Sequence, residues 1–334
     1  MSIVVYCSGS VSKGLGHIQR ARVFSDSLFK AGYNVTMFIR ADKELILSHQ
    51  YVGYQMNRIN DDEELVTFII NQKPSLLVFD TLSFPEALFE RIEPHIAVIS
   101  ISPIFNLNNR MKGVFSRVLL EGVSTDRLFY GLQYSIFSEY CKSVDYYHYL
   151  EHLSQETLSI GVSMGGTDAP NKTLRIVEAL SKINNPSTFW ILLGEGYLHS
   201  YDELAHIAGR EKKHEFILAK TSRSMWKILS SCSLNILSGG ITLLESVYAG
   251  IPSIHLFEKE EHRKLVPEEI RDKGSIVDLG VFKEDTLVEL PNVIENMIEN
   301  RSILLRMHES MKGILDKQAP VRIIRICEQK RWLQ

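Results

Sequence analysis

The stretch that decides the fold is Ile3-Val4-Val5-Tyr6-Cys7-Ser8-Gly9-Ser10-Val11-Ser12-Lys13-Gly14-Leu15-Gly16-His17, in which an apolar run passes into a glycine-rich turn. A short run rich in β-branched residues predicts a buried strand over Ile3–Cys7, and the turn precedes a predicted helix over His17–Lys30. A glycine turn at this place lets backbone N–H groups approach an anion closely. The opening residues therefore predict an α/β sheet with a ligand site at the end of its first strand.

The same pattern recurs in the second half of the chain. The apolar run Leu158–Val162 leads into Ser163-Met164-Gly165-Gly166-Thr167-Asp168, and Leu234–Leu237 leads into Ser238-Gly239-Gly240-Ile241-Thr242. Strand and helix signals alternate through both halves, which implies parallel sheets with right-handed crossovers. We therefore expect an α/β protein of two Rossmann-like domains that face each other across a cleft.

The length of 334 residues favours two domains over one. We expect the first domain over residues 1–153, the second over 154–318, and a terminal helix over 319–334 that packs back on the first domain. Residues 106–149 are rich in tyrosine and show no pattern that assigns their secondary structure. Elsewhere the expected strands are short apolar runs, as is typical of buried parallel strands.

Composition excludes several classes of partner. The net charge of −3 gives no bulk field that would attract nucleic acid or an anionic membrane. The four cysteines have no CxxC spacing and are expected to be reduced core residues. We find no signal-peptide pattern at the start and no apolar stretch of about 18 residues. The sequence thus predicts a cytoplasmic protein with a small-molecule substrate, without nucleic acid or stable membrane insertion.

The candidate residues of the first domain surround the first glycine turn. Gly14 and Gly16 shape the turn, and His17 follows in the first helical turn, where its imidazole can transfer a proton near neutral pH. Arg20 lies one helical turn further on, where it holds a phosphate, anchors His17 or is solvated. Asp80 ends the expected strand Leu76–Phe79 and is either a carboxylate of the site or a cap of the turn before Pro85.

The candidate residues of the second domain are mainly turn residues. The two later turns supply the anion-binding candidates Gly165, Gly166, Thr167, Ser238, Gly239, Gly240 and Thr242. The turn Ser163–Asp168 is neither a Walker A nor a GxGxxG motif, and no acidic residue ends a second strand at the expected place, which argues against a nicotinamide dinucleotide. No cofactor and no metal site is expected.

Three further polar residues of the second domain are candidates. Asp168 caps the next helix or contacts ligand. Glu245 falls one turn into the helix after Gly240, where it binds sugar hydroxyls or is buried with a partner. His262 lies in the charged run Glu258–Lys264, which follows a strand end and is either a solvated face or part of the substrate-binding residues.

These residues carry a resemblance to a known superfamily. The pairing of Gly14-Leu15-Gly16-His17-Ile18-Gln19-Arg20 with Ser163–Asp168 and Asn171 resembles the GT-B superfamily, and more closely the UDP-sugar hydrolases of pseudaminic acid biosynthesis and the related spore-coat polysaccharide proteins. The similarity continues over 240–252 and 262–274. It implies a GT-B fold and hydrolysis of the sugar C1–O bond of a UDP-linked acetamido sugar, with release of UDP.

The resemblance also implies roles for single residues. His17 corresponds to the acid/base of the hydrolases, the amides of Gly165–Thr167 and Gly239–Thr242 would receive the pyrophosphate, and Glu245 would bind the uridine ribose. Two places depart from the hydrolases. Asp80 is followed by Thr81-Leu82, where they usually carry a tyrosine, and His262-Arg263 stand where they usually carry Asn-Gln. Both places lie on the sugar side in the relatives, so the sugar stays open.

Two other functions fit the same residues. A glycosyltransferase of the same fold would hand the sugar to an acceptor. A nucleotide-sugar-binding protein without catalysis would bind the donor alone.

Overall fold

The computed structural model describes residues 1–10, 14–42, 53–220 and 225–333. Val11, Ser12 and Lys13 of the first turn, and 222–224 of a helix expected over 222–230, lie outside the described residues. The chain forms two compact units. Unit 1 comprises Met1–Ser138 with Asp316–Gln334, and unit 2 comprises Glu139–Leu315.

The division between the units falls at residues 138 and 139, whereas the sequence led us to expect it at 153 and 154. The difference is the helix α4 (Tyr146–Ser154), which belongs to unit 2. Its Tyr149 is fully buried, donates a hydrogen bond to the backbone oxygen of Ser233 at 2.8 Å and stacks on His308 at 4.4 Å between ring centroids. The residues between α4 and β8 are thus a loop within unit 2.

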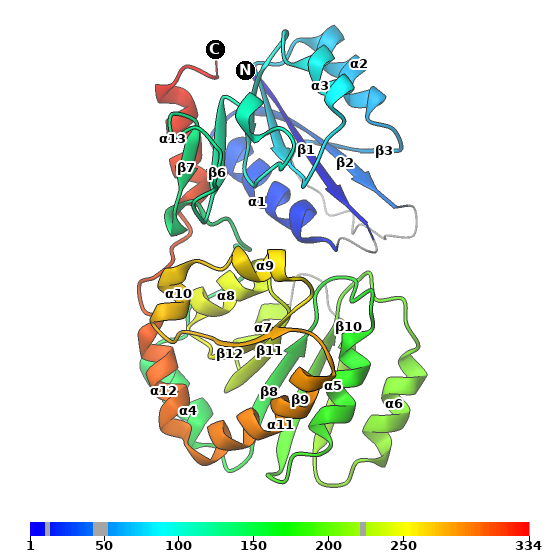
Figure 1. Ribbon diagram of the computed structural model, residues 1–334, viewed down its shortest axis with the longest axis vertical. Helices are drawn as coiled ribbons and strands as arrows, with labels where there is room; N and C mark the ends of the chain where they lie inside the picture. Colours follow the sequence, from blue (N-terminus) through cyan, green and yellow to red (C-terminus); the bar gives the residue numbers. More distant parts are fainter. Residues whose placement is uncertain (11–13, 43–52, 221–224, 334) are drawn as a thin grey trace. The chain divides into compact units, whose positions relative to one another are not determined.

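Unit 1 is a seven-stranded parallel sheet flanked by helices, in the order β3-β2-β1-β4-β5-β6-β7 (Figure 1). Its strands are β1 (Ser2–Gly9), β2 (Asn34–Ala41), β3 (Gln55–Ile59), β4 (Leu76–Asp80), β5 (Ala97–Ser100), β6 (Gly113–Ser116) and β7 (Leu128–Tyr130). Its helices are α1 (Gly16–Lys30), α2 (Glu63–Gln72), α3 (Glu86–Ile92), α13 (Ala319–Gln329) and the 3₁₀ turns at Asn108–Arg110 and Leu132–Tyr134.

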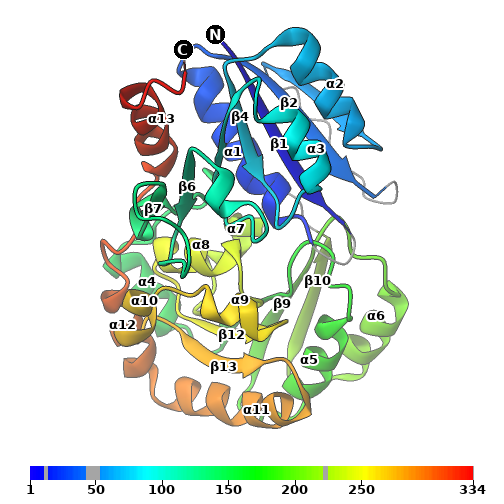
Figure 2. The same cartoon turned by 45° about the horizontal axis from the view of Figure 1, so that its top comes forward.

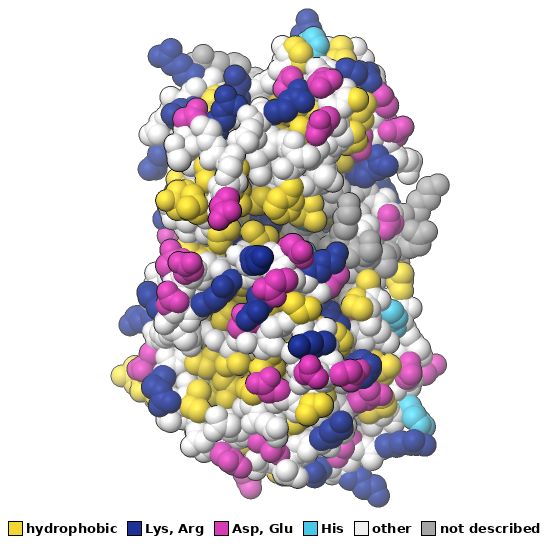
Figure 3. Space-filling model, viewed as in Figure 1, with side chains coloured by type: hydrophobic (Ala, Val, Ile, Leu, Met, Phe, Trp, Pro, Cys, Tyr) yellow, Lys and Arg dark blue, Asp and Glu magenta, His cyan; other side chains and the backbone are white. Residues whose placement is uncertain are grey.

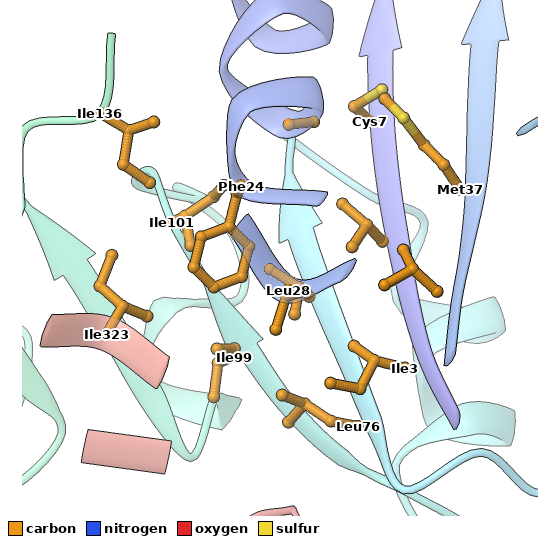
Figure 4. Packing of buried hydrophobic residues seen from close by; sticks show 14 of the residues in the cluster. Ile3, Cys7, Phe24, Leu28, Met37, Leu76, Ile99, Ile101, Ile136 and Ile323 are labelled. Atoms are coloured by element: carbon orange, nitrogen blue, oxygen red, sulfur yellow. The ribbon is translucent and has the colours of Figure 1, made fainter. Parts of the chain in front are cut away.

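Alternate side chains of β1 enter two separate cores, because successive residues of a strand point to opposite faces. Ile3 and Val5 pack with α1 and α13, and Figure 4 shows Phe24 of α1 and Ile323 of α13 in this core. Val4 packs on the other face with residues of α2 and α3. The sheet is therefore covered on both faces, and the terminal helix α13 is part of the core of unit 1.

The region without a sequence pattern contains β6 and β7. Both strands are short, and β7 is an edge strand with one buried residue, Leu128. A short edge strand shows little periodicity because only part of it is buried.

Unit 2 is a six-stranded parallel sheet in the order β10-β9-β8-β11-β12-β13. Its strands are β8 (Leu158–Ser163), β9 (Ser187–Leu193), β10 (Glu215–Lys220), β11 (Leu234–Leu237), β12 (Ser253–Phe257) and β13 (Val277–Val281). Besides α4, its helices are α5 (Lys172–Leu180), α6 (Tyr201–Arg210), α7 (Met225–Leu229), α8 (Ile241–Ala249), α9 (Glu260–Lys264), α10 (Glu268–Asp272), α11 (Glu284–Glu299) and α12 (Arg301–Ser310). Figure 2 shows α5 and α6 beside β9 and β10. Two parallel α/β sheets are thus confirmed.

Candidate functional site

Strand order places a binding site in each unit. In unit 1 the order reverses between β1 and β4, and in unit 2 it reverses between β8 and β11. At such a reversal the connections leave in opposite directions, so a crevice opens at the carboxyl ends of the two strands. His17 and Asp80 flank the reversal in unit 1, and the two later glycine turns flank it in unit 2.

The first turn delivers His17 to this place. Gly14 has φ +80°, a left-handed conformation that glycine adopts without strain, and its N–H donates to the oxygen of Ser10 at 2.9 Å. A Cβ on Gly9 would lie 2.6 Å from the Ile18 side chain, so glycine at this position lets α1 pack closely on the end of β1. The helix begins at Gly16, and His17 therefore stands in its first turn.

Asp80 binds His17 and Arg20 together. Its Oδ1 lies 2.6 Å from His17 Nδ1, and its Oδ2 accepts from Arg20 Nε at 2.7 Å. Arg20 also pairs with Oδ1 through its terminal nitrogen, and the Ser102 hydroxyl donates to Oδ1 at 2.8 Å. The carboxylate is fully buried, whereas the side chains of His17 and Arg20 are each 15% exposed. The buried Asp80 carboxylate thus orients two partly exposed side chains, the His17 imidazole and the Arg20 guanidinium.

Charge balance keeps Asp80 ionised. Burial alone would raise the pKa of its carboxyl group, but the Arg20 guanidinium and the His17 imidazole outweigh burial and lower that pKa. Arg20 Nη2 also lies 2.9 Å from His17 Nδ1. An ionised carboxylate only accepts hydrogen bonds, so the His17 tautomer that fits Asp80 donates from Nδ1 and leaves Nε2 for another partner. This arrangement, a histidine oriented by a buried carboxylate, is suited to general acid/base chemistry.

Two residues of this site escaped the sequence analysis. Ser102 follows β5 and bonds Asp80, and Arg117 follows β6. Burial and the neighbouring Arg20 lower the pKa of Arg117 to about 10. Each residue follows a strand of the parallel sheet. Because β5 was expected from the sequence, the position of Ser102 just after it could have marked Ser102 as a candidate. Arg117 could not be found in this way, because the sequence gives no pattern that predicts β6.

Thr81, which departs from the pattern of the hydrolases, lies at the same reversal. Its hydroxyl group is 2.6 Å from that of Ser8 at the end of β1 and donates to the oxygen of Ser83 at 3.1 Å. Thr81 is buried and ties the ends of β1 and β4 together.

The two glycine turns of unit 2 lie side by side. The N–H of Ser238 donates to the oxygen of Ser163 at 3.2 Å, and a Cβ on Gly165 would lie 3.4 Å from the Ser238 hydroxyl. Gly165 and Gly240 have φ +96° and +101°, values that side chains rarely allow. The Thr242 hydroxyl donates to the Ser238 oxygen at 3.1 Å, so it holds the second turn. The two turns, Ser163–Thr167 and Ser238–Thr242, contain no charged side chain.

The first of these turns is packed tightly against the end of β9. A Cβ on Gly194 would lie 2.4 Å from the backbone oxygen of Gly166, and the N–H of Gly196 donates to that oxygen at 2.9 Å. Gly239 is similarly close to Phe257, whose ring atoms would lie 2.3 Å from a Cβ. The glycines therefore serve close packing as well as backbone exposure.

Asp168, three residues before the N-cap Asn171, binds the first two N–H groups of the helix α5. It is buried, its Oδ1 accepts from the N–H of Lys172 at 2.9 Å, and its Oδ2 accepts from the N–H of Thr173 at 2.8 Å. Burial raises the pKa of its carboxyl group in spite of these bonds. Of the two roles the sequence left open, the geometry is that of a cap.

Glu245 and His262 occupy different surroundings. Glu245 is buried and its Oε2 accepts from the indole N–H of Trp226 at 2.8 Å, so one carboxylate oxygen is already engaged. His262 lies half-buried on α9, which follows β12. Its neighbour Arg263 pairs with Asp278 at 2.8 Å, which ties α9 to β13.

Figure 3 shows basic and acidic side chains interspersed on the face in view, with no extended field of one sign. Among the described residues, no group of three His, Cys, Asp or Glu side chains could hold a metal ion. No helix in the described ranges has the length and apolarity to cross a membrane.

The fold and both strand reversals define a GT-B-like α/β protein, and comparison with solved structures agrees. MurG of Acinetobacter baumannii superimposes with a TM-score of 0.65 at 14% identity, over 98% of this chain and 100% of that one. UDP-GlcNAc 2-epimerase from Neisseria meningitidis bound to UDP-GlcNAc superimposes with a TM-score of 0.63 at 13% identity, over 98% of this chain and 100% of the other. At such identities the likeness shows the fold.

Two curated proteins are similar in sequence. The spore coat polysaccharide biosynthesis protein SpsG of Bacillus subtilis is 21% identical over 347 aligned positions that cover 98% of each chain. The uncharacterized protein MJ1062 of Methanocaldococcus jannaschii is 23% identical over 305 positions, which are 86% of this chain and 62% of that protein. This chain thus spans under two thirds of the length of the archaeal relative. No family model matches the chain.

Proposed function

We propose that this protein is a UDP-sugar hydrolase that cleaves the C1–O bond of a UDP-linked acetamido sugar and releases UDP, in the biosynthesis of a surface glycan of the nonulosonic acid type. The observation that carries the proposal is the His17–Asp80 pair with Arg20 and Ser102 at the strand reversal of unit 1. Similarity to a spore coat polysaccharide biosynthesis protein and a fold shared with an epimerase bound to UDP-GlcNAc support the substrate class.

The proposed binding step uses unit 2. Amides of Gly165–Thr167 and Gly239–Thr242 receive the diphosphate, since left-handed glycines expose backbone N–H groups that favour anions. Glu245, whose Oε2 accepts from the Trp226 indole, binds the ribose. His262 faces the substrate from α9. These roles rest on the resemblance and on the adjacency of the two turns.

The proposed chemical step uses unit 1. His17 Nε2 accepts a proton from a water molecule as the water oxygen bonds to C1 of the sugar. The C1–O bond breaks, its electron pair goes to the leaving phosphate oxygen, and UDP departs. Asp80 stabilises the imidazolium that forms, and Arg20 keeps Asp80 in place. Fixed amide dipoles stabilise the charge that develops on the diphosphate.

A glycosyltransferase is the alternative that the same geometry supports. A histidine base oriented by Asp80 would deprotonate an acceptor hydroxyl as readily as water, and WaaG, a glycosyltransferase involved in lipopolysaccharide biosynthesis, shares the fold. A binding protein without catalysis is less favoured, because a buried carboxylate that orients a partly exposed histidine is a costly arrangement that binding alone does not require.

The experiment is a UDP-release assay with a panel of UDP-N-acetylamino sugars and no acceptor. The wild-type protein is expected to release UDP in buffer, and His17→Ala is expected to lose turnover by about 10²–10⁴-fold while retaining UDP binding. The exposed His206→Ala variant, on α6 of unit 2, is the matched control and keeps full turnover. If UDP is released only after an acceptor is added, the protein is a glycosyltransferase and the hydrolase proposal is wrong. If the protein binds UDP but shows no turnover in either case, it is a binding protein without catalysis.

The same proposal places the enzyme in the cytoplasm. All four cysteines are buried and none forms a disulfide, as is typical of thiols in a reducing compartment.

A further inference from the structure

A hollow of about 470 Å³ lies at the edge of unit 1 opposite to the His17–Asp80 site. It is formed where α2 and α3 end, where β5 and β6 begin, and where the chain turns after α13. These are the amino ends of β5 and β6, whereas His17 and Asp80 stand at carboxyl ends of strands. We name this hollow the basal groove and define it by Lys73, Lys112, Arg331, His95, Glu93 and Trp332.

The basal groove has an excess of positive charge. Lys73, Lys112 and Arg331 are exposed cations from three different segments. Among the described residues, none of the three takes part in an ion pair. Glu93, the one carboxylate in the lining, is paired with Arg110. Three cations that form no ion pair within the described residues therefore line one hollow, together with a single carboxylate that Arg110 already pairs.

Helix ends explain only part of this charge. Lys73 and Arg331 follow the last turns of α2 and α13, where a cation complements the helix dipole by about 0.3–1 kcal/mol. Lys112 directly precedes β6 and has no helix end to complement. Lys73 and Arg331 also hold φ +45° and +58°, values at which glycine or asparagine is favoured at such a helix end. Charge is thus present where a smaller uncharged residue would fit with less strain.

We propose that the basal groove binds a small polyanion with two or more phosphate or carboxylate groups. The volume falls in the range of small-molecule sites, about 300–1,000 Å³. Arginine and lysine from separate segments can each hold a different oxygen group, and Arg331 can bind one in a bidentate manner. Trp332 lines the groove. Its ring is held in place because its centroid lies 6.2 Å from that of Phe129, and because the ring packs so closely on Gly113 that a Cβ there would lie 2.6 Å from it. Its indole gives the ligand a rigid apolar wall.

The test uses the intact chain with 5-fluorotryptophan in place of its three tryptophans, Trp190, Trp226 and Trp332. Trp332→Phe assigns the fluorine resonance of the groove, and Trp226, bonded to Glu245, reports on the glycine turns of unit 2. Inorganic tripolyphosphate and citrate are titrated separately. We expect a saturable shift of the Trp332 resonance that weakens as salt is raised. Tripolyphosphate alone would indicate a phosphate site, and both probes would indicate a general polyanion site.

Charge variants decide whether the groove is responsible. Lys73→Ala/Lys112→Ala/Arg331→Ala is expected to weaken binding by about ten-fold or more, which corresponds to 1.4 kcal/mol. The matched control is Arg325→Ala/Lys330→Ala, which removes two exposed cations of the same terminal segment that do not line the groove. Thermal unfolding confirms that each variant is folded. A Trp332 resonance that never moves, that moves equally in the triple variant, or that stays still while Trp226 moves would overturn the proposal.

Discussion

Unit 1 and unit 2 share the same strand order around their reversal points, yet the residues at these equivalent positions differ in kind: charged side chains in unit 1 and glycines in unit 2. The order β3-β2-β1-β4 in unit 1 matches the order β10-β9-β8-β11 in unit 2. In each unit the strand that comes first in the chain, β1 or β8, therefore ends beside the fourth, β4 or β11. In unit 1 that place is occupied by a buried carboxylate, an arginine and a histidine. In unit 2 it is occupied by Gly165, Gly166, Gly239 and Gly240.

The difference shows that strand order decides where a site forms, and the residues of the turns decide what it does. Charged side chains need partners when they are buried, and Asp80 accordingly receives hydrogen bonds from three side chains. Glycine turns carry no such requirement and leave backbone N–H groups near the helix starts. We interpret unit 1 as the half suited to proton transfer and unit 2 as the half suited to an anion.

The largest effect is expected from a substitution that disrupts the charged cluster of unit 1, formed by His17, Arg20 and Asp80. Asp80→Asn removes the ionised acceptor of His17 and Arg20, so His17 loses the orientation that makes Nε2 the base. We expect kcat for UDP release to fall by about 10²–10⁴-fold while the Kd for UDP is unchanged. Ser102→Ala, which removes one neutral bond to the same carboxylate, serves as the milder control. Equal kcat in Asp80→Asn and wild type would show that His17 does not depend on this partner.

The second effect concerns the titratable group buried behind the glycine turns of unit 2. His255 on β12 is fully buried, and its Nε2 lies 2.8 Å from the Ser253 hydroxyl. Burial lowers the pKa of its imidazole from 6.5 to about 4. Because the unfolded chain takes up the proton first, stability falls as pH drops from about 6.5 to about 4, by about 3 kcal/mol in total.

Urea unfolding at a series of pH values measures this dependence. In His255→Gln the fall of the unfolding free energy over the same window is expected to shrink by that amount, whatever the variant's stability at neutral pH. Parallel curves for variant and wild type would mean that His255 is not the group that couples pH to the stability of unit 2.

The third effect tests close packing at the first turn of unit 2. A Cβ at Gly194 would stand 2.4 Å from the backbone of Gly166, and neither backbone can move away cheaply. Gly194→Ala is expected to cost about 1–3 kcal/mol of stability and to weaken UDP binding about ten-fold. Gly209→Ala is the control, since no atom lies within 4 Å of its Cβ position and helix α6 favours alanine. Calorimetric titration with UDP compares the two, and equal affinities would remove the turn from the binding surface.

The smallest effect separates capping from ligand contact. Asp168 and Asp145 both accept hydrogen bonds from two N–H groups at a helix start in unit 2. Each substitution by alanine is expected to lower stability by about 0.5–2 kcal/mol, and neither is expected to weaken UDP binding more than a few-fold. A large loss of UDP affinity in Asp168→Ala alone would assign this carboxylate to the ligand.

Much of this arrangement could be predicted from local sequence. The glycine turns, the first helix and the expected parallel strands follow from patterns within a few residues, because backbone freedom and periodicity act locally. The short strand β7 and the boundary between the units, which lies before α4, could not be predicted from such local patterns. Leu128 is the one buried residue of β7, and Tyr149 is buried by residues more than 80 positions away in sequence.

The sequence by itself determined that this chain forms two α/β halves with glycine turns after their first strands, and it singled out His17. Only the tertiary structure decided that Asp80, 63 residues from His17, binds it, that Ser102 joins them, and that Asp168 and Glu245 have partners within the protein. Local patterns specify backbone conformation, whereas the partner of a buried charge depends on which strands become neighbours in the sheet. That neighbourhood is set by burial of both faces of the whole sheet.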